Sequence, residues 1–272
     1  MVNVRELLKA SQLPRLETHM LLQHVLQVSR VWLITHDVDP LDPSSVAQYR
    51  ALEQQRLDGR PMAYLLGWRE FMGHEFAVSP AVLIPRPETE LLVETGLDVL
   101  ARSGLAEPRV LDMGTGSGAI AVSIALACVK AQVVATDVSA EAVALARDNA
   151  RRLGARVEFF HGNWYHAVSG QPKFDLIVSN PPYISANDPH LEQGDLRFEP
   201  AGALTDGADG LDALRAIARD AHLWLKPSGA LWMEHGWDQA SAVRCLLQQA
   251  GFKMVESLPD LAGIERVSGG YL

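Results

Sequence analysis

The 272-residue sequence has few of the residues that disulfides, catalytic thiols and metal sites require. Its two cysteines, Cys128 and Cys245, each fall within a helical apolar pattern. We therefore expect small core residues rather than a disulfide, a metal pair or a nucleophile. The nine histidines show no metal-ligand spacing, and neither a phosphate-loop lysine nor a nucleophile-elbow serine is present. The sequence therefore predicts no metal and disfavours hydrolase chemistry.

Positive charge and long apolar runs are also scarce. Lysine and arginine number 24 against 33 aspartates and glutamates, and the net charge of −9 opposes a broad grip on nucleic acid, so no direct DNA binding is expected. The N-terminus lacks a signal-peptide pattern, and the most apolar stretch, near residues 20–34, is interrupted by polar side chains. These patterns predict a cytoplasmic protein without a membrane segment, and a monomer is the default expectation.

The chain is long enough for one large domain and one small one. Residues 1–72 predict short helices, because Asn3 and Glu6 form a capping-box pair and Asp42-Pro43 begins a helix that Gly59 can end. Aromatic residues among glycines from about residue 63 to 85 predict a hairpin, which gives a hairpin linker at residues 73–87. Residues 88–272 form the larger domain.

Strand-like and helix-like segments alternate through residues 88–272, which is typical of a parallel sheet covered on both faces. The helix after Ser139 has a serine cap and ends at Gly154. Residues 258–263 leave no room for a helix between the last two strands, so these strands should pair antiparallel. The sequence predicts an α/β domain with a seven-stranded Rossmann-like sheet, with strands near residues 109–113, 132–137, 156–160, 174–179, 230–235, 252–258 and 264–270.

A glycine-rich turn joins the first of these strands to its helix. Glycines there allow the backbone to approach a ligand closely. A dinucleotide site has two residues between its second and third glycines, whereas one stands here, and this favours S-adenosylmethionine over NAD. Asp112 can meet the ammonium group of that cofactor, and a tight packing turn is the alternative. The turn consists of Gly114, Thr115, Gly116, Ser117 and Gly118.

Two later strand ends complete the expected nucleoside site. Asp137 ends the next strand about twenty residues past the turn, where its carboxylate can take both hydroxyls of a ribose. Trp164 follows the third strand, where its indole face can pack on adenine, with a core position as the alternative.

The tetrapeptide Asn180, Pro181, Pro182 and Tyr183 follows the apolar segment 174–179, at a strand end where α/β enzymes keep their chemistry. The Asn180 side-chain oxygen and the Pro181 carbonyl can each accept one N–H of a planar amine, and Tyr183 can stack on its face. Such a nitrogen is a poor nucleophile because its lone pair is delocalised, so two fixed acceptors favour its attack. The loop predicts alkylation of an amide or nucleobase amino group, catalysed by Asn180, Pro181 and Tyr183. A Pro-Pro turn is the structural alternative.

With these motifs assembled, the chain resembles the HemK/PrmC family of protein-glutamine methyltransferases almost from end to end. The first and last of the matching segments are not general methyltransferase features, which makes the resemblance specific. These segments are residues 84–90 (IPRPETE), 112–118 (DMGTGSG), 180–184 (NPPYI), 197–200 (RFEP) and the acidic-glycine stretch through 207–211.

The resemblance implies a seven-stranded class I methyltransferase domain and a helical N-terminal domain that engages bacterial class I peptide-chain release factors. The implied reaction, part of translation termination, methylates the glutamine side-chain amide of the Gly-Gly-Gln tripeptide with S-adenosylmethionine. The family assigns cofactor contacts to residues 114–118, Asp137, Trp164 and Asn180. It assigns the glutamine clamp to residues 180–183, Pro182 included. Asn163 is a departure, because relatives often have an acidic residue there.

Two other functions stay open at this point. An adenine exocyclic amine presents the same chemistry to the same tetrapeptide, although the acidic charge and the lack of an evident target-reading domain oppose a nucleic-acid substrate. A non-catalytic cofactor-binding scaffold that acts through the helical domain would leave the Asn-Pro-Pro-Tyr loop without a use.

Overall fold

The computed structural model describes residues 2–272, and the chain divides into two compact units, Met1–Trp68 and Arg69–Leu272. In the first unit the predicted capping box of Asn3 and Glu6 is confirmed, and Asp42 caps the helix that Pro43 begins. The apolar faces of its helices meet in one core that includes Leu21 and Tyr49. The helices are α1 (Val4–Ala10), α2 (Arg15–Leu26), α3 (Arg30–Thr35), α4 (Pro43–Leu57) and α5 (Met62–Leu66).

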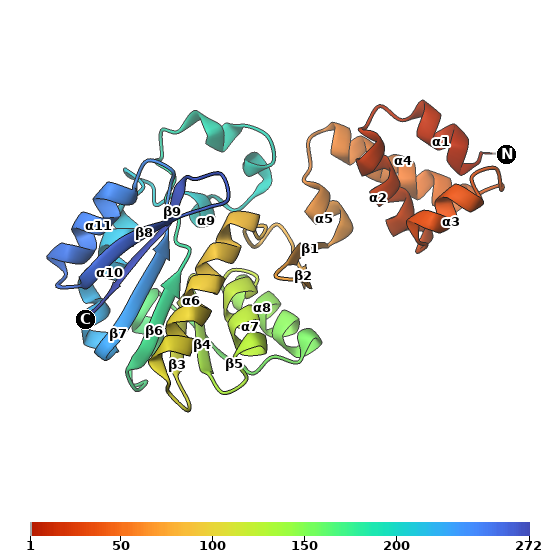
Figure 1. Cartoon of the computed structure of the whole chain (residues 1–272). Helices are drawn as coiled ribbons and strands as arrows, with labels where there is room; N and C mark the ends of the chain where they lie inside the picture. Colours follow the sequence, from red (N-terminus) through yellow and green to blue (C-terminus); the bar gives the residue numbers. More distant parts are fainter. Residues whose placement is uncertain (1) are drawn as a thin grey trace. The chain divides into compact units, whose positions relative to one another are not determined.

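The second unit contains a seven-stranded sheet in the order β5-β4-β3-β6-β7-β9-β8 (Figure 1). Neighbouring strands from β5 to β7 run parallel, whereas β9 pairs antiparallel with both β7 and β8. The predicted α/β sheet with an antiparallel last strand is therefore confirmed. The strands are β3 (Arg109–Met113), β4 (Gln132–Asp137), β5 (Val157–His161), β6 (Phe174–Ser179), β7 (Leu225–Glu234), β8 (Lys253–Pro259) and β9 (Glu265–Tyr271).

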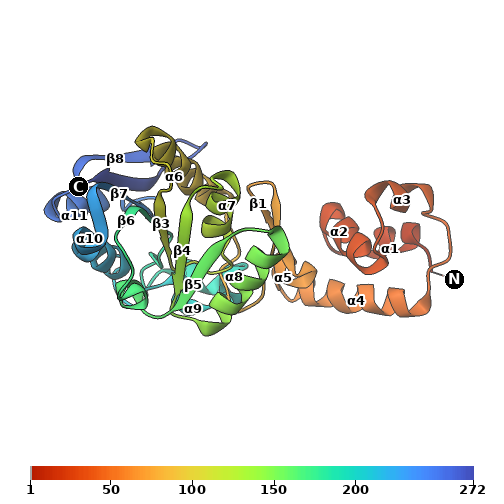
Figure 2. The same ribbon diagram turned by 90° about the horizontal axis from the view of Figure 1, so that it is seen from below.

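Helices cover both faces of this sheet (Figure 2). Val110 and Leu176 point into the core beneath α6, α7 and α8, and their neighbours Leu111 and Ile177 point into the core beneath α10 and α11. Because successive strand residues face opposite sides, a sheet buried on both faces requires unbroken apolar strands. The covering helices are α6 (Glu90–Ser103), α7 (Ala119–Ala127), α8 (Ala140–Leu153), α10 (Asp212–Trp224) and α11 (Ala240–Gln249).

The hairpin that precedes the sheet consists of β1 (Trp68–Phe71) and β2 (His74–Ala77), so it begins ahead of the predicted linker at residues 73–87. The buried Asn149 on α8 ties it to the glycine-rich turn. Its Oδ1 accepts the Ala77 N–H at 2.8 Å, and its Nδ2 donates to the carbonyls of Ala77 at 3.0 Å and Ser117 at 2.8 Å. Three bonds from one buried amide thus hold the turn against the hairpin.

The remaining short elements lie in loops of the second unit: η1 (Pro87–Thr89), η2 (Trp164–Val168), η3 (Pro189–Glu192), η4 (Leu196–Phe198) and α9 (Ala201–Leu204). Cys128 and Cys245 are free, but the prediction that both are core residues is wrong. Cys128 is half-buried after α7, and Cys245 lies on the solvent face of α11, where Gln249 contacts its sulfur. Within residues 2–272, no helix combines the length and the apolar character needed to cross a membrane.

Candidate active site

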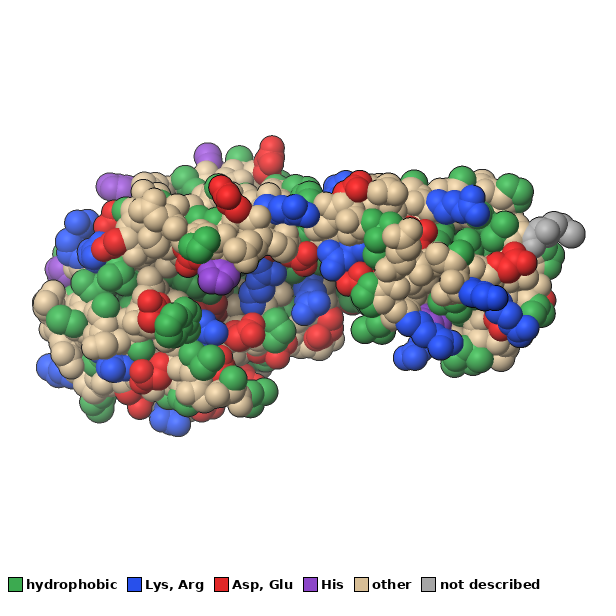
Figure 3. Space-filling view, turned by 90° about the horizontal axis from the view of Figure 1, so that it is seen from above, with side chains coloured by type: hydrophobic (Ala, Val, Ile, Leu, Met, Phe, Trp, Pro, Cys, Tyr) green, Lys and Arg blue, Asp and Glu red, His purple; other side chains and the backbone are tan. Residues whose placement is uncertain are grey.

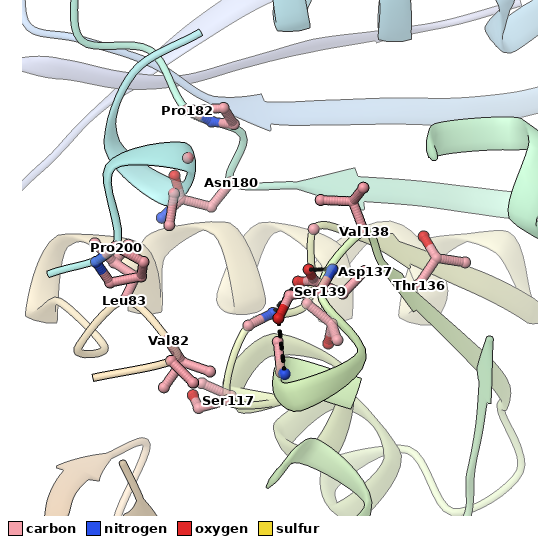
Figure 4. Close-up of a pocket in the computed structure, with 18 of the residues that line it drawn as sticks. Val82, Leu83, Ser117, Thr136, Asp137, Val138, Ser139, Asn180, Pro182 and Pro200 are labelled. Atoms are coloured by element: carbon pink, nitrogen blue, oxygen red, sulfur yellow. Dashed lines mark hydrogen bonds between the residues drawn. The ribbon is translucent and has the colours of Figure 1, made fainter. Parts of the chain in front are cut away.

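A large cavity in the second unit lies at the carboxyl ends of the parallel strands, where the strand order reverses around β3. Its volume is about 390 Å³. Its walls come from the turn after β3, the ends of β4 and β5, the loop after β6, and segments 80–86 and 200–203. Figure 4 shows Asp137, Asn180 and Pro200 lining this cavity from three different segments.

The glycine-rich turn forms one wall of this large cavity. Gly114 and Gly116 have φ angles of 72° and 55°, which lie in the left-handed region that glycine adopts without strain. A Cβ on Gly116 would meet no atom within 4 Å, so this backbone faces open space in the cavity. Gly118 does not line the cavity, and a Cβ there would lie 3.1 Å from the Ala146 Cβ. The third glycine therefore allows α7 and α8 to pack closely.

Asp137 stands at the end of β4, at the edge of the large cavity. Its Oδ2 accepts the Gly116 N–H at 2.9 Å, and its Oδ1 accepts the Ser139 N–H at 2.9 Å. Partial burial raises the pKa of Asp137, and these backbone donors oppose the rise. A carboxylate oxygen that accepts one N–H keeps a free lone pair. The residue can therefore accept two hydroxyl groups of a ligand while it anchors the turn.

Asp112 lies beneath the glycine-rich turn and is not among the residues that line the cavity. It is fully buried, and its Oδ2 accepts the Thr115 hydroxyl at 2.6 Å and the Ala121 N–H at 3.2 Å. Burial raises the pKa of Asp112 to about 7, because the charged form loses its hydration. The structure does not bring Asp112 to the place expected for a ligand ammonium group, and it makes the residue a support of the turn.

Trp164 contributes both to the cavity wall and to the protein core. It opens η2 with a φ of 41° and packs partly buried against the core beneath α10. It also lines the cavity, and its Cζ3 lies 3.8 Å from the position that a Gly114 Cβ would occupy. Trp164 therefore belongs both to the core and to the cavity wall, and its packing on adenine stays a prediction.

Asn180 lies at the junction of two cavities. It lines the large cavity and also a narrow one of about 60 Å³ whose lining includes Pro181 and Tyr183. Its Nδ2 donates to the hydroxyl of Thr89 at 3.1 Å. Because the oxygen and nitrogen of an amide point in different directions, this bond leaves Oδ1 turned away from Thr89. Asn180 is therefore oriented by the first turn of the segment that leads into α6.

Tyr183 is held in place at both its ends. Its hydroxyl donates to Glu234 Oε1 at 3.0 Å, and its backbone carbonyl accepts from Gln239 Nε2 at 3.0 Å. Burial raises the pKa of Tyr183 well above its usual value, and the Glu234 carboxyl raises it further, so the phenol keeps its proton. Pro182 lines the large cavity, whereas Pro181 and Tyr183 line the narrow one.

Comparisons with known proteins identify the family of this chain. Residues 88–199 match the Methyltransferase small domain and residues 2–67 match the PrmC N-terminal domain. The release factor glutamine methyltransferase of Bordetella pertussis is 62% identical over 272 residues, which cover 100% of both chains. The chain belongs to the release factor glutamine methyltransferase family. The resemblance inferred from its motifs is confirmed.

Other members of the release factor glutamine methyltransferase family are similar over nearly the same length. The protein of Burkholderia pseudomallei is 55% identical and covers 98% of this chain and 95% of its own. Among solved structures, a methyltransferase from Pyrococcus furiosus has a TM-score of 0.54 and 19% identity, covering 84% of this chain and 98% of its own. That likeness supports the methyltransferase fold alone.

Several residues around this family's site were not singled out from the sequence. Glu199 is buried, accepts the Ile84 N–H at 2.9 Å and pairs with Arg86, so it joins the two segments that cover the large cavity. Glu199 and Arg86 both lie in motifs that carried the family resemblance, so the sequence contained a signal for this pair. Glu234 ends an apolar strand, and a carboxylate at the carboxyl end of a buried strand was a second signal. Gln239 had no comparable signal.

Proposed function

We propose that this protein methylates the side-chain amide nitrogen of the glutamine in the Gly-Gly-Gln tripeptide of class I peptide-chain release factors, with S-adenosylmethionine as the methyl donor. Family membership supports the substrate, because the relatives that match the whole chain are named release factor glutamine methyltransferases. The narrow cavity beside the large one supports the chemistry, because it offers a separate place for an acceptor group.

The position of Asn180 between the two cavities is the observation that carries this proposal. The large cavity has the glycine backbone, the carboxylate of Asp137 and the flat face of Trp164 that a nucleoside with an amino-acid tail requires. The narrow cavity is lined by Pro181 and Tyr183. Among residues 2–272, those that line both cavities are Leu83, Arg86, Asn180 and Ala203. A methyl donor in one cavity and an amide in the other would therefore meet at Asn180.

The cavity residues fit S-adenosylmethionine. We assign the methionine portion to the Gly114 and Gly116 backbone, the ribose to Asp137, and one face of the adenine to Trp164. Asp112 acts from below, because its bonds to Thr115 and Ala121 fix the turn. The cofactor supplies an activated methyl group on a sulfonium centre, so the protein need supply mainly orientation.

The clamp residues act on the acceptor amide. Asn180 Oδ1 and the Pro181 carbonyl each accept one amide N–H, and the Tyr183 ring packs on the amide plane. These contacts turn the nitrogen toward the methyl group, and such in-line positioning can contribute about 7–11 kcal/mol to rate enhancement. With the cofactor bound, these residues would hold the nitrogen in line with the methyl group that the sulfonium supplies, and the nitrogen would release its proton to solvent after transfer. No strong general base is needed for this order of events.

We further propose that the first unit engages the release factor. Val31 and Ile34 stand three positions apart on α3, so they share a helix face, and they are 68% and 63% exposed. Val38 adds an exposed side chain shortly after that helix. Paired apolar side chains open to solvent are suited to a protein partner. We propose a monomer as the working form.

Nucleic acid is disfavoured as the substrate. Acidic and basic side chains are interspersed over the face drawn in Figure 3, and that face has no broad basic area. The net charge of −9 points the same way, since phosphate binding depends on clustered lysine and arginine. These observations favour a protein amide over a nucleobase as the methyl acceptor.

The experiment that tests the function offers both substrates at once. Purified protein is incubated with methyl-labelled S-adenosylmethionine, unmodified release factor and unmethylated DNA, and the label is located by mass spectrometry. We expect the label on the glutamine of the tripeptide. Label on adenine would mean that the clamp is correct and its substrate wrong, and a protein that binds the cofactor but transfers no methyl group would be a scaffold.

A further inference from the structure

Glu234 is a buried carboxyl group directly behind the Asn-Pro-Pro-Tyr loop. It ends β7, is 2% exposed and lines neither cavity. Its Oε1 accepts the Tyr183 hydroxyl at 3.0 Å. Its Oε2 is buried and forms no hydrogen bond within the described part of the chain. Burying a carboxyl group without a full set of hydrogen bonds lowers the stability of the folded protein. The position of Glu234 beside the clamp therefore suggests a function.

Thr89 is hydrogen-bonded to Asn180 and also influences this carboxyl group. Its side chain is buried, its Oγ1 accepts from Asn180 Nδ2 at 3.1 Å, and its hydroxyl lowers the pKa of Glu234. A hydroxyl that accepts one bond still has its own hydrogen to donate. The carboxylate is the acceptor suited to that hydrogen. Two hydrogen-bonded pairs, Asn180 with Thr89 and Tyr183 with Glu234, thus stand beside the two cavities, and the Thr89 hydroxyl is the group that can link them.

We propose that Glu234 is a positioning residue that sets the direction of the hydrogen bonds behind the clamp. As a carboxylate it can only accept, so Tyr183 donates to Oε1 and the Thr89 hydrogen would turn toward the unpaired Oε2. Thr89 must then accept from Asn180, and the Asn180 amide presents its oxygen to the substrate. This inference rests on the proposed function, because it concerns the acceptor that holds the amide N–H. It adds a residue that touches neither substrate nor cofactor.

The direction of these bonds depends on whether Glu234 is ionised. Burial, together with the charge of Glu88 on η1, raises the pKa of Glu234 to about 7 against the lowering effect of Thr89, Tyr183 and Arg266 on β9. When the group takes up a proton, one of its oxygens becomes a donor, so the carboxyl group no longer obliges both Tyr183 and Thr89 to donate to it. The clamp should therefore be ordered above about pH 7 and lose its order as the pH falls through that value.

Glu234→Gln tests this inference because glutamine has nearly the same size but donates through its nitrogen. We expect kcat for release-factor glutamine to fall by about 10- to 100-fold, since one fixed acceptor is lost from the clamp. Binding of S-adenosylmethionine should stay within about threefold by calorimetry. If Glu234 only stabilised the fold, Glu234→Gln would lower the melting temperature, and it would not lower kcat while leaving the affinity for S-adenosylmethionine unchanged.

The pH profile of kcat gives a second readout. Wild type should lose activity below about pH 7, and this acid limb should be weaker or absent in Glu234→Gln. Asp112, which has a pKa near the same value, is present in both proteins, so the difference between the two profiles reports Glu234. Glu88→Gln removes a neighbouring negative charge that raises the Glu234 pKa, so it should move the limb to lower pH. The exposed Glu256→Gln is the matched control and should leave the profile unchanged.

Two further measurements keep the inference testable if Glu234→Gln folds poorly. Thr89→Val should lower kcat as Glu234→Gln does, whereas Thr89→Ser, which keeps the hydroxyl, should restore most of it. In cofactor-free protein, carbon-13 NMR of labelled glutamate should show one carboxyl group titrating near pH 7 that Glu234→Gln removes. A Glu234→Gln enzyme with wild-type kcat and an unchanged acid limb overturns the inference.

These outcomes are distinguishable from failure of the proposed function. If wild type methylates adenine rather than glutamine, the proposed substrate is wrong, and the same variants still decide the role of Glu234 on the amine that is used. If wild type methylates glutamine and Thr89→Val matches wild type, the positioning role fails alone.

Discussion

Asp137→Ala is the substitution that tests the cofactor site most directly. The carboxylate accepts 2.9 Å hydrogen bonds from the N–H groups of Gly116 and Ser139 while it lines the large cavity. It also has one free lone pair per oxygen for a ribose hydroxyl. A hydrogen bond to a charged group contributes about 1.5–3 kcal/mol, so loss of two ribose contacts has an upper bound of about 6 kcal/mol.

We expect each lost contact to cost an amount near the low end of the range for one hydrogen bond, because water can refill the opened cavity. Binding of S-adenosylmethionine should weaken about 100-fold, which corresponds to about 2.8 kcal/mol. The turn also loses two backbone anchors, so we expect unfolding to be easier by about 1–2 kcal/mol, or about 2–8 °C in melting temperature. The effect on binding should therefore exceed the effect on stability.

Isothermal titration calorimetry measures the affinity for S-adenosylmethionine, and thermal unfolding measures the change in melting temperature. Asp148→Ala is the matched control, because Asp148 is an exposed aspartate on α8 whose ion pair with Arg151 lies in solvent. It should bind the cofactor as wild type does. If folded Asp137→Ala binds within threefold of wild type, the assigned ribose contact is wrong.

Three further predictions follow from the same geometry. Asn180→Ala should lower kcat about 10- to 100-fold with little change in cofactor affinity, and full turnover would refute the clamp. Burial raises the pKa of Asp112 from 3.8 to about 7, so wild type should lose roughly 2–4 kcal/mol of stability as the pH rises from about 4 to 7. Asp112→Asn should lack this loss. Urea unfolding of both proteins at pH 5 and pH 8 measures the difference. Val31→Ser with Ile34→Ser should raise KM for release factor severalfold but leave kcat and cofactor binding unchanged; an unchanged KM would contradict docking through α3.

The regular elements were predictable because their signals are local. The strands β3, β4 and β6 have the predicted bounds, and β5, β8 and β9 are displaced by one residue. Ser139 caps α8 and Gly154 ends it, as predicted. An apolar run between turn signals, a capping side chain and a glycine end all act within a few residues, so the sequence displays them directly.

Local signals failed where burial decided the conformation. Tyr64, Leu65 and Leu66 were expected in a hairpin, but they are part of α5, and Leu65 and Leu66 pack into the core of the helical unit. A short apolar run fits a buried helix as well as a strand, and only its packing partners distinguish them. The strand β7 starts at Leu225 rather than near residue 230, with a register shift in its pairing to β6. Cys245 is exposed because α11 turns that face to solvent.

The sequence by itself determined the class of fold, the family and the positions of the glycine-rich turn, Asp137 and the Asn-Pro-Pro-Tyr loop, since each is a contiguous motif at a strand end. Only the tertiary structure decided that Asp112 supports the turn from below, that Gly118 serves helix packing, and that Asn180 lies between two cavities. The hydrogen bonds of Asn180 to Thr89 and of Tyr183 to Glu234 join segments far apart in the chain. Hydrogen bonds and burial between distant segments depend on how the chain packs, and no local pattern records them.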